Sequence, residues 1–231
     1  HVVRVRAHDA AGNVSAWSSA IVRFGGSVAV GVGFAKNETW VVGLTAATAM
    51  AQAPDGRWFV AEQDGTVRVV ASNGTLLTTP FLQLLGVDST NERGLIGLTL
   101  HPNFASNGLV YAHYTTNVAR VHNRVSTFQA TPPISNTASP TTEVFILDDL
   151  PTLIAPNHNG GAIDFGPDGR LYVAVGDNAT ASNAQTLTNR HGKMLRYNAD
   201  GSIPLDDPFY GTASGANRAI WTLGLRNPFA F

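Results

Sequence analysis

The sequence of 231 residues contains no cysteine. Without thiols the chain can form neither a disulfide framework nor a thiolate zinc site, and it offers no cysteine nucleophile. Apolar runs are short as well, since none approaches the roughly 18 residues that a membrane-spanning helix requires. We therefore expect no membrane span, and because no segment shows a sustained helical period, we expect an all-β chain.

Charge is also scarce. Asp, Glu, Lys and Arg make up 13% of the residues, about half of the share usual in soluble proteins. The 15 basic and 16 acidic side chains give a formal net charge of −1, so the composition offers no electrostatic basis for binding nucleic acid or an anionic membrane surface. Low charge with abundant Gly, Thr, Ser and Asn is typical of secreted bacterial β proteins, and we expect a secreted or periplasmic location.

Residues 1–24 predict a β-hairpin. Residues 2–6 alternate Val and Arg, the period of a half-buried strand, and residues 9–13 supply turn formers before a second strand at residues 18–24. The run RAHDAAGNVSAWS resembles the last strands of a fibronectin type III domain, which implies a spacer or adhesion module. We expect residues 25–39 to be a linker that leads into a different domain.

A repeated pattern begins at about residue 40. Each repeat contains a strand, a turn with proline and a second strand, and Pro54, Pro102 and Pro167 lie 48 and 65 residues apart. A β-only repeat of about 40–50 residues with loop insertions is typical of propeller blades. We predict about three to four propeller blades over residues 40–231. The alternative is an open β-sandwich in which the turns recur by coincidence.

Three loops carry conspicuous polar residues, at residues 91–97, 157–161 and 224–229. The first two directly precede the innermost strand of their repeats, and the third precedes what would be another such strand at the end of the chain. Equivalent positions of a radial repeat converge on its axis, so we expect the three loops to lie together at one end of the channel.

His158 is the natural general base in these loops, because a neutral imidazole accepts a proton near physiological pH. Arg226 is permanently cationic, and its planar fork of donors suits a carboxylate or a developing oxyanion. Asn157 or Asn227 would orient the imidazole or bind a polar ligand. Asp177 is assigned to capping a turn, with calcium binding as the weaker alternative. No serine lies in a nucleophile loop motif, so hydrolysis through a covalent intermediate is disfavoured.

Four ordered runs together resemble the glucose/sorbosone dehydrogenase family, the soluble quinoprotein sugar dehydrogenases built on a six-bladed propeller. The runs lie at residues 92–104, 157–161, 192–204 and 224–228. The resemblance implies that a sugar or related alcohol is oxidised with pyrroloquinoline quinone (PQQ), assisted by calcium, and that an external acceptor takes the electrons.

By this resemblance, His158 matches the base that takes the substrate hydroxyl proton while hydride passes to the quinone. Arg226 matches the arginine that stabilises negative charge on the quinone oxygen, and Asn227 matches a cofactor-contacting asparagine. Calcium ligands and further basic cofactor contacts are expected beyond residue 231, so no metal ligand is assigned within the chain. Since the chain starts at His1 and stops at Phe231, we expect a piece of a longer enzyme that is inactive alone.

Two positions depart from the family pattern. Asn157 stands where the soluble glucose enzymes carry an acidic residue before the base, and Glu92 stands where they carry a glutamine near the cofactor. Both remain candidate cofactor contacts, and we expect the negative charge of Glu92 to be compensated by Arg93 or a metal. These changes weaken the case for glucose as the substrate.

A non-catalytic secreted propeller that binds glycans or protein partners is the main alternative, since some relatives use this propeller for binding alone. A binder has no reason to keep both His158 and Arg226, which favours the enzyme. A lactonase-type hydrolase needs acidic calcium ligands that point into the channel, and the sequence supplies no convincing set.

Overall fold

The computed structural model describes three parts of the chain, residues 2–5, 18–21 and 40–231. The chain divides into two compact units, His1–Val42 and Gly43–Phe231.

The first unit contains a two-stranded antiparallel sheet. Strand β1 (Val2–Val5) pairs with strand β2 (Ser18–Ile21), at the two strand positions that the alternation of residues predicts. The turn expected at residues 9–13 and the linker expected at residues 25–39 lie outside the described residues. The likeness of residues 1–24 to a fibronectin domain therefore stays a prediction.

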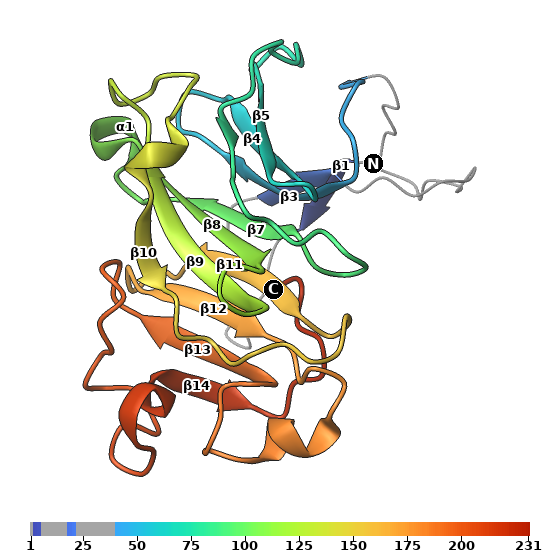
Figure 1. The fold of residues 1–231 in the computed structure, drawn as a ribbon. Coiled ribbons are helices and arrows are strands. Elements are labelled where there is room, and N and C mark those ends of the chain that lie inside the picture. The colour runs from blue at the N-terminus through green and yellow to red at the C-terminus, as the bar shows by residue number, and fades with distance from the viewer. Residues whose placement is uncertain (1, 6–17, 22–39) are drawn as a thin grey trace. The chain divides into compact units, whose positions relative to one another are not determined.

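Three four-stranded antiparallel sheets make up the second unit (Figure 1). In each sheet the strands follow one another in chain order, which is the construction of a propeller blade. The prediction of an all-β partial propeller is confirmed, with three blades in the described part of the chain. The first blade contains β3 (Ala47–Gln52), β4 (Trp58–Glu62), β5 (Thr66–Val70) and β6 (Leu82–Gln83), the second β7 (Leu95–Leu100), β8 (Leu109–Thr116), β9 (His122–Gln129) and β10 (Val144–Leu147), and the third β11 (Gly160–Phe165), β12 (Leu171–Val175), β13 (Lys193–Tyr197) and β14 (Ile220–Leu223).

The predicted proline turns join the first two strands of each blade. In the first blade, Gly56 N donates to Ala53 O at 2.9 Å, and in the third, Gly169 N donates to Gly166 O at the same distance. In the second blade, Pro102 leads into the single-turn helix α1 (Phe104–Asn107) instead. Other helical segments among the described residues are short 3-10 turns, at Pro140–Thr142, Ala181–Gln185 and Gly215–Ala219.

The first strands of the three blades, β3, β7 and β11, pack side by side. Between β7 and β11 the two backbones approach so closely that no side chain fits. A Cβ atom on Gly97 would lie 2.0 Å from Gly161 O. This contact brings the beginnings of β7 and β11 together, which is where two of the candidate loops lie.

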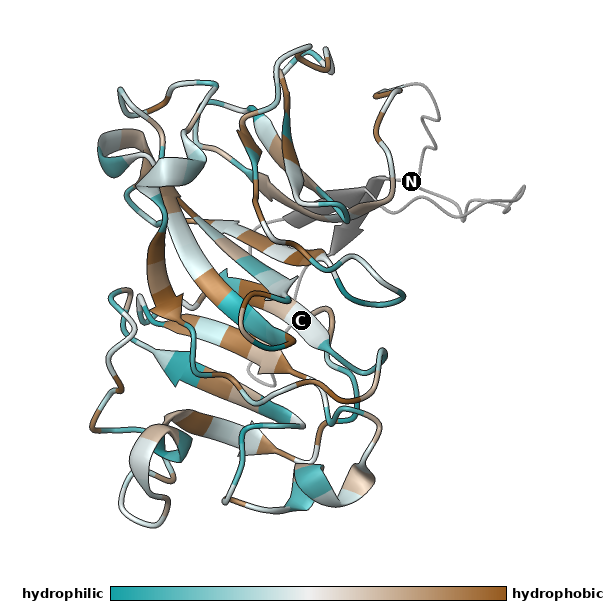
Figure 2. Ribbon diagram, viewed as in Figure 1, coloured by the Kyte–Doolittle hydropathy of each residue, from teal (hydrophilic) through white to brown (hydrophobic). Residues whose placement is uncertain are grey.

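Hydrophobic residues line the strands of all three sheets (Figure 2) and form two cores between successive blades. In the first core, the ring of Phe59 meets Phe81 and Phe104 edge-on, with centroids 4.9 and 5.4 Å apart. In the second core, Tyr111 and Val173 belong to neighbouring blades. Full burial of side chains of this size contributes about 1.5–3 kcal/mol each, so hydrophobic packing is the main force that holds the blades together.

Three polar contacts cross the second core from the second blade to backbone carbonyls of the third. Tyr111 Oη donates to Ala199 O at 3.0 Å, and Asn123 Nδ2 donates to Asn159 O at 2.8 Å. His113 Nδ1 lies 3.0 Å from Gly161 O, and since a carbonyl only accepts, Nδ1 carries the proton. All three side chains are buried, and so are Asn159 and Gly161, whereas Ala199 is half-buried. The bonds of Asn123 and His113 therefore satisfy carbonyls that water does not reach.

We expect Gly97→Ala to destabilise the protein by about 2 kcal/mol or more, because overpacking a rigid contact typically costs 1–3 kcal/mol. Gly211→Ala is the matched control, since no atom lies within 4 Å of its Cβ position and neither glycine has a left-handed φ. Urea unfolding of the whole protein measures both variants. An equal loss of stability in the two would contradict the close approach of β7 and β11.

The buried His113 predicts a stability that depends on pH. Burial lowers the pKa of His113 from its ordinary 6.5 to about 4, so between these values the unfolded chain binds a proton at this residue and the folded chain does not. Stability should therefore fall as the pH falls from 6.5 to 4, by at most about 3 kcal/mol from this group. In unfolding curves over this range, the stability advantage of the wild type over His113→Asn should shrink. An advantage that stays constant with pH would show that His113 is not held neutral.

Candidate active site

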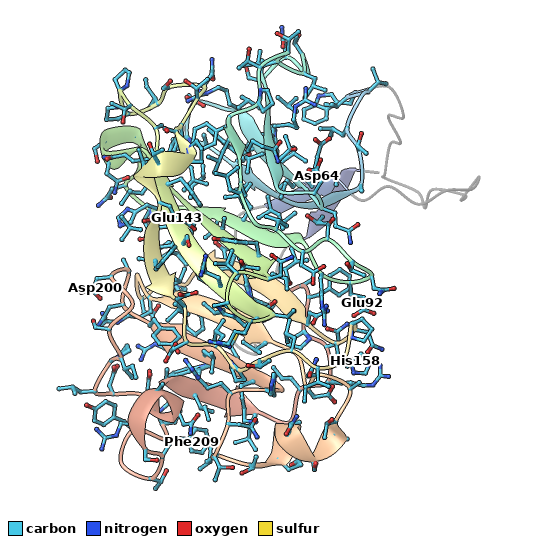
Figure 3. All side chains as sticks on the ribbon, in the orientation of Figure 1. Asp64, Glu92, Glu143, His158, Asp200 and Phe209 are labelled. Atoms are coloured by element: carbon cyan, nitrogen blue, oxygen red, sulfur yellow. The ribbon has the colours of Figure 1, made fainter. Side chains whose placement is uncertain are left out.

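The three candidate loops meet at the beginning of β11, as their positions in the repeat predict. Glu92 Oε2 accepts hydrogen bonds from His158 N at 2.7 Å and from Asn227 Nδ2 at 3.2 Å. Asn227 Oδ1 in turn accepts from Gly160 N at 3.0 Å. Figure 3 shows Glu92 and His158 on the same side of the three-bladed unit. Glu92 thus joins two residues that follow it by 66 and by 135 positions in the sequence, His158 and Asn227, in one network.

His158 is buried, with 8% of its surface exposed, and its backbone has φ +55°, in the left-handed region. The ring is held on one side, because Nδ1 lies 2.8 Å from Asp177 Oδ1. Among the described residues the other ring nitrogen, Nε2, has no hydrogen-bond partner. The carboxylate of Asp177 places the proton on Nδ1, so Nε2 carries the lone pair.

Asp177, and neither Asn157 nor Asn227, orients the imidazole. It lies just after β12 with 3% of its surface exposed. Its Oδ1 also accepts from Ala179 N at 2.9 Å, so the expected turn capping is present together with the bond to His158. Its backbone N donates to Arg226 O at 2.8 Å, which ties the third loop to the same point.

A buried lysine supports the turn that carries Asp177. Lys193 Nζ donates to Asn183 O at 2.7 Å and to His191 O at 2.6 Å, and Asn183 Nδ2 donates to Asp177 O at 3.0 Å. Burial lowers the pKa of Lys193 to about 8, since its ammonium group has lost its hydration. The sequence offered no sign of this role, because Lys193 lies within a strand.

Two of the predicted residues keep free polar groups. Arg226 is exposed, and within the described residues its guanidinium has no hydrogen-bond or ion-pair partner. Asn157 is half-buried, and its amide likewise contacts no partner among them. Asn157 precedes His158 in the chain and Arg226 precedes Asn227, so these two wholly unbonded side chains belong to the same loops and are available for a ligand.

Arg93 does not compensate the negative charge of Glu92, contrary to the expectation from the sequence. Arg93 Nη1 pairs with Asp88 Oδ2 at 2.9 Å, and its Nη2 donates to Ala155 O at 3.3 Å. The carboxylate of Glu92 is bonded instead by the N–H donors of His158 and Asn227. No group of three or more His, Asp or Glu side chains suited to a metal ion occurs in the described part of the chain.

Comparison with known proteins identifies the family of the chain. The model of the family described as "Glucose / Sorbosone dehydrogenase" matches residues 44–231. The chain belongs to the glucose/sorbosone dehydrogenase family. The match covers all three blades and begins beyond the two-stranded unit. Among the described residues, no helix is long and apolar enough to cross a membrane.

Relatives of the chain include enzymes of this family. The aldose sugar dehydrogenase YliI of Escherichia coli (strain K12) is 31% identical over 156 residues, which cover 67% of this chain and 41% of that protein. The PQQ-bound aldose sugar dehydrogenase of Streptomyces coelicolor superposes with a TM-score of 0.69 at 29% identity, over 81% of this chain and 53% of that one. The Hedgehog-interacting protein of Mus musculus is 28% identical over 195 residues, 74% of this chain and 27% of that protein. The chain thus spans about half or less of the length of these relatives.

The bond between His158 and Asp177 predicts a downfield imidazole N–H resonance in the proton NMR spectrum of the whole protein. Asp177→Ala removes the acceptor at 2.8 Å, so this resonance should disappear. Asp164→Ala is the control, because Asp164 is a carboxylate of β11 that bonds Thr99 Oγ1 and not His158. The signal is assigned by its absence in His158→Gln. Its persistence in Asp177→Ala would show that another group orients the ring.

Proposed function

We propose that the whole protein is a PQQ-dependent oxidoreductase that oxidises a sugar or related alcohol by hydride transfer to the quinone. The observation that carries this proposal is the buried pair of His158 and Asp177, whose Nδ1–Oδ1 bond leaves the base nitrogen Nε2 unbonded. The exposed Arg226 next to it in the same loop network supplies a cation without a partner among the described residues. Membership of the family and the PQQ-bound relative support the same function.

His158 takes the proton of the substrate hydroxyl at Nε2. Asp177 holds the ring in the tautomer that leaves this nitrogen bare, and its carboxylate stabilises the imidazolium that forms. The left-handed φ of His158 is held by bonds to its own N and O, from Glu92 Oε2 and Asn178 N. The base is therefore preorganised before the substrate binds, which is the condition for efficient proton transfer.

The available donors fit an anionic cofactor such as PQQ, which is rich in carboxylates. Arg226 and Asn157 would donate to its oxygens, and Arg226 would stabilise negative charge that develops on the quinone oxygen. When bound, PQQ supplies the acceptor for the hydride. Glu92 and Asn227 stay candidate cofactor contacts, since Glu92 Oε1 and one N–H of Asn227 are unused within the described residues.

Calcium belongs to the proposal through the family resemblance, and no residue of the described chain is assigned as its ligand. The substrate class follows from the sugar dehydrogenases among the relatives, and an external acceptor would reoxidise the cofactor. The low content of charged residues supports a secreted or periplasmic location. The non-catalytic alternative is supported by the match to the Hedgehog-interacting protein.

Replacement of the base tests the proposal in the whole protein. His158→Ala should lower kcat for dye-linked aldose oxidation by about 10²–10⁴-fold, which is the usual contribution of a general base, while PQQ binding in a fluorescence titration is retained. Arg226→Leu should weaken PQQ binding as well as lower kcat. His101→Ala is the control, because His101 bonds Asn103 N in the turn after β7, away from the His158 network.

Each outcome decides between the two functions. Unchanged turnover in His158→Ala would refute the general-base role. A wild-type protein that binds no PQQ and oxidises no aldose, even with calcium present, would favour the binding propeller.

A further inference from the structure

Residues 158–161 adopt a backbone that the chain would not adopt unaided. His158, Gly160 and Gly161 have φ values of +55°, +74° and +134°. A left-handed conformation is disfavoured for a residue with a side chain, and it persists only where its surroundings enforce it. The groups that hold this segment therefore determine where the imidazole of His158 lies.

Three of these groups belong to the site already described. Glu92 Oε2 accepts from His158 N, Asn227 Oδ1 accepts from Gly160 N, and Asn178 N donates to His158 O. None of the three bonds involves the carbonyls of Asn159 and Gly161, which accept hydrogen bonds from the second blade.

Asn123 of β9 donates a hydrogen bond to the first of these carbonyls, that of Asn159. Its Oδ1 accepts from Thr115 Oγ1 at 2.8 Å, which fixes the orientation of the amide and directs Nδ2 to Asn159 O, also at 2.8 Å. Thr115 N is itself bonded to Gly94 O at 2.9 Å. The amide is thus held between the Glu92 loop and the His158 loop, with 1% of the surface of Asn123 exposed.

His113 of β8 donates a hydrogen bond to the second carbonyl, that of Gly161. Its Nδ1 donates to Gly161 O at 3.0 Å, its side chain is fully buried, and its Nε2 has no partner within the described residues. The imidazole therefore makes a single directional bond, and that bond ends on the His158 segment. Asn159 and Gly161 flank Gly160, so the second blade restrains the segment on both sides of the residue that Asn227 holds.

We propose that His113 and Asn123 are positioning residues for the base. They fix the carbonyls of Asn159 and Gly161, and through these the place of His158 relative to the substrate. This inference rests on the proposed function, in which His158 accepts the substrate proton. A displacement of about 1 Å at a reacting group can cost 10²-fold in rate, so the loss of either bond should reduce kcat without altering what the other groups bind.

A bond of the same kind provides the control. Tyr111 Oη donates to Ala199 O at 3.0 Å, so it joins the same two blades, from a buried side chain to a backbone carbonyl. Ala199 follows β13 and lies outside the 158–161 segment. Tyr111→Phe therefore removes one bond between the blades without releasing His158.

Two substitutions of His113 by an amide residue separate the effect of its hydrogen bond from the effect of its size. The Nδ2 of an asparagine can stand where Nδ1 of the imidazole stands, whereas the Nε2 of a glutamine reaches to the position of the ring Nε2. His113→Asn should keep the bond to Gly161 O and stay within about threefold of the wild-type kcat. His113→Gln and Asn123→Ala should each lower kcat tenfold or more, with the KM for the sugar and the PQQ affinity within twofold.

The measurements are made on the whole protein with two readouts, dye-linked kinetics and the downfield N–H resonance of His158. The resonance should shift or broaden in His113→Gln and Asn123→Ala and remain unchanged in His113→Asn and Tyr111→Phe. An equal loss of kcat in Tyr111→Phe, or an unchanged resonance in both disrupting variants, would overturn the positioning role. If the wild type shows no turnover, the proposed function fails, and the resonance alone still tests whether these residues position His158.

Discussion

The direct approach of two backbones, at Gly97 of β7 and Gly161 of β11, is the constraint on which the site depends. Because neither glycine carries a side chain at this contact, the loop before β7 lies within hydrogen-bond reach of the loop before β11. Glu92 can then accept from His158 N, and His113 on the next strand of its blade can reach across β7 to Gly161 O. Any side chain at Gly97 would separate these groups. The loop that carries His158 is thus positioned by the contact between blades rather than within one blade.

Much of this architecture could be predicted from the sequence. Proline turns recur because each blade needs a tight connection between its first two strands, and their spacing predicts the blades. The convergence of Glu92, His158 and Asn227 follows from the radial repeat, and the structure places all three in one hydrogen-bonded network. Loop position could be derived because it depends on the repeat alone.

The residues that act through other residues could not be derived in this way. Asp177 lies opposite His158 in the extension of the β11–β12 ladder, where Gly160 pairs with Val175. A predicted register for that hairpin would therefore have identified Asp177 as the partner of His158. His113 and Lys193 lie inside strands, where the pattern reports only alternation. Their partners are backbone carbonyls, which leave no signature in a sequence, and the pairing of Arg93 with Asp88 rather than Glu92 depends on loop geometry.

The distribution of satisfied and free groups separates a catalytic site from a binding surface. Four polar side chains around His158 form hydrogen bonds with the backbone of residues 158–161 and so hold the loop. They are Glu92, Asn227, Asn123 and His113. Within the described residues, the groups without a partner include the bare Nε2 of His158 and the side chains of Arg226 and Asn157, which belong to the same set of loops. A surface that only binds would gain nothing from a strained, fully restrained imidazole with one bare nitrogen. A proton acceptor beside an anion site requires both features, and this favours chemistry over binding at this end of the propeller.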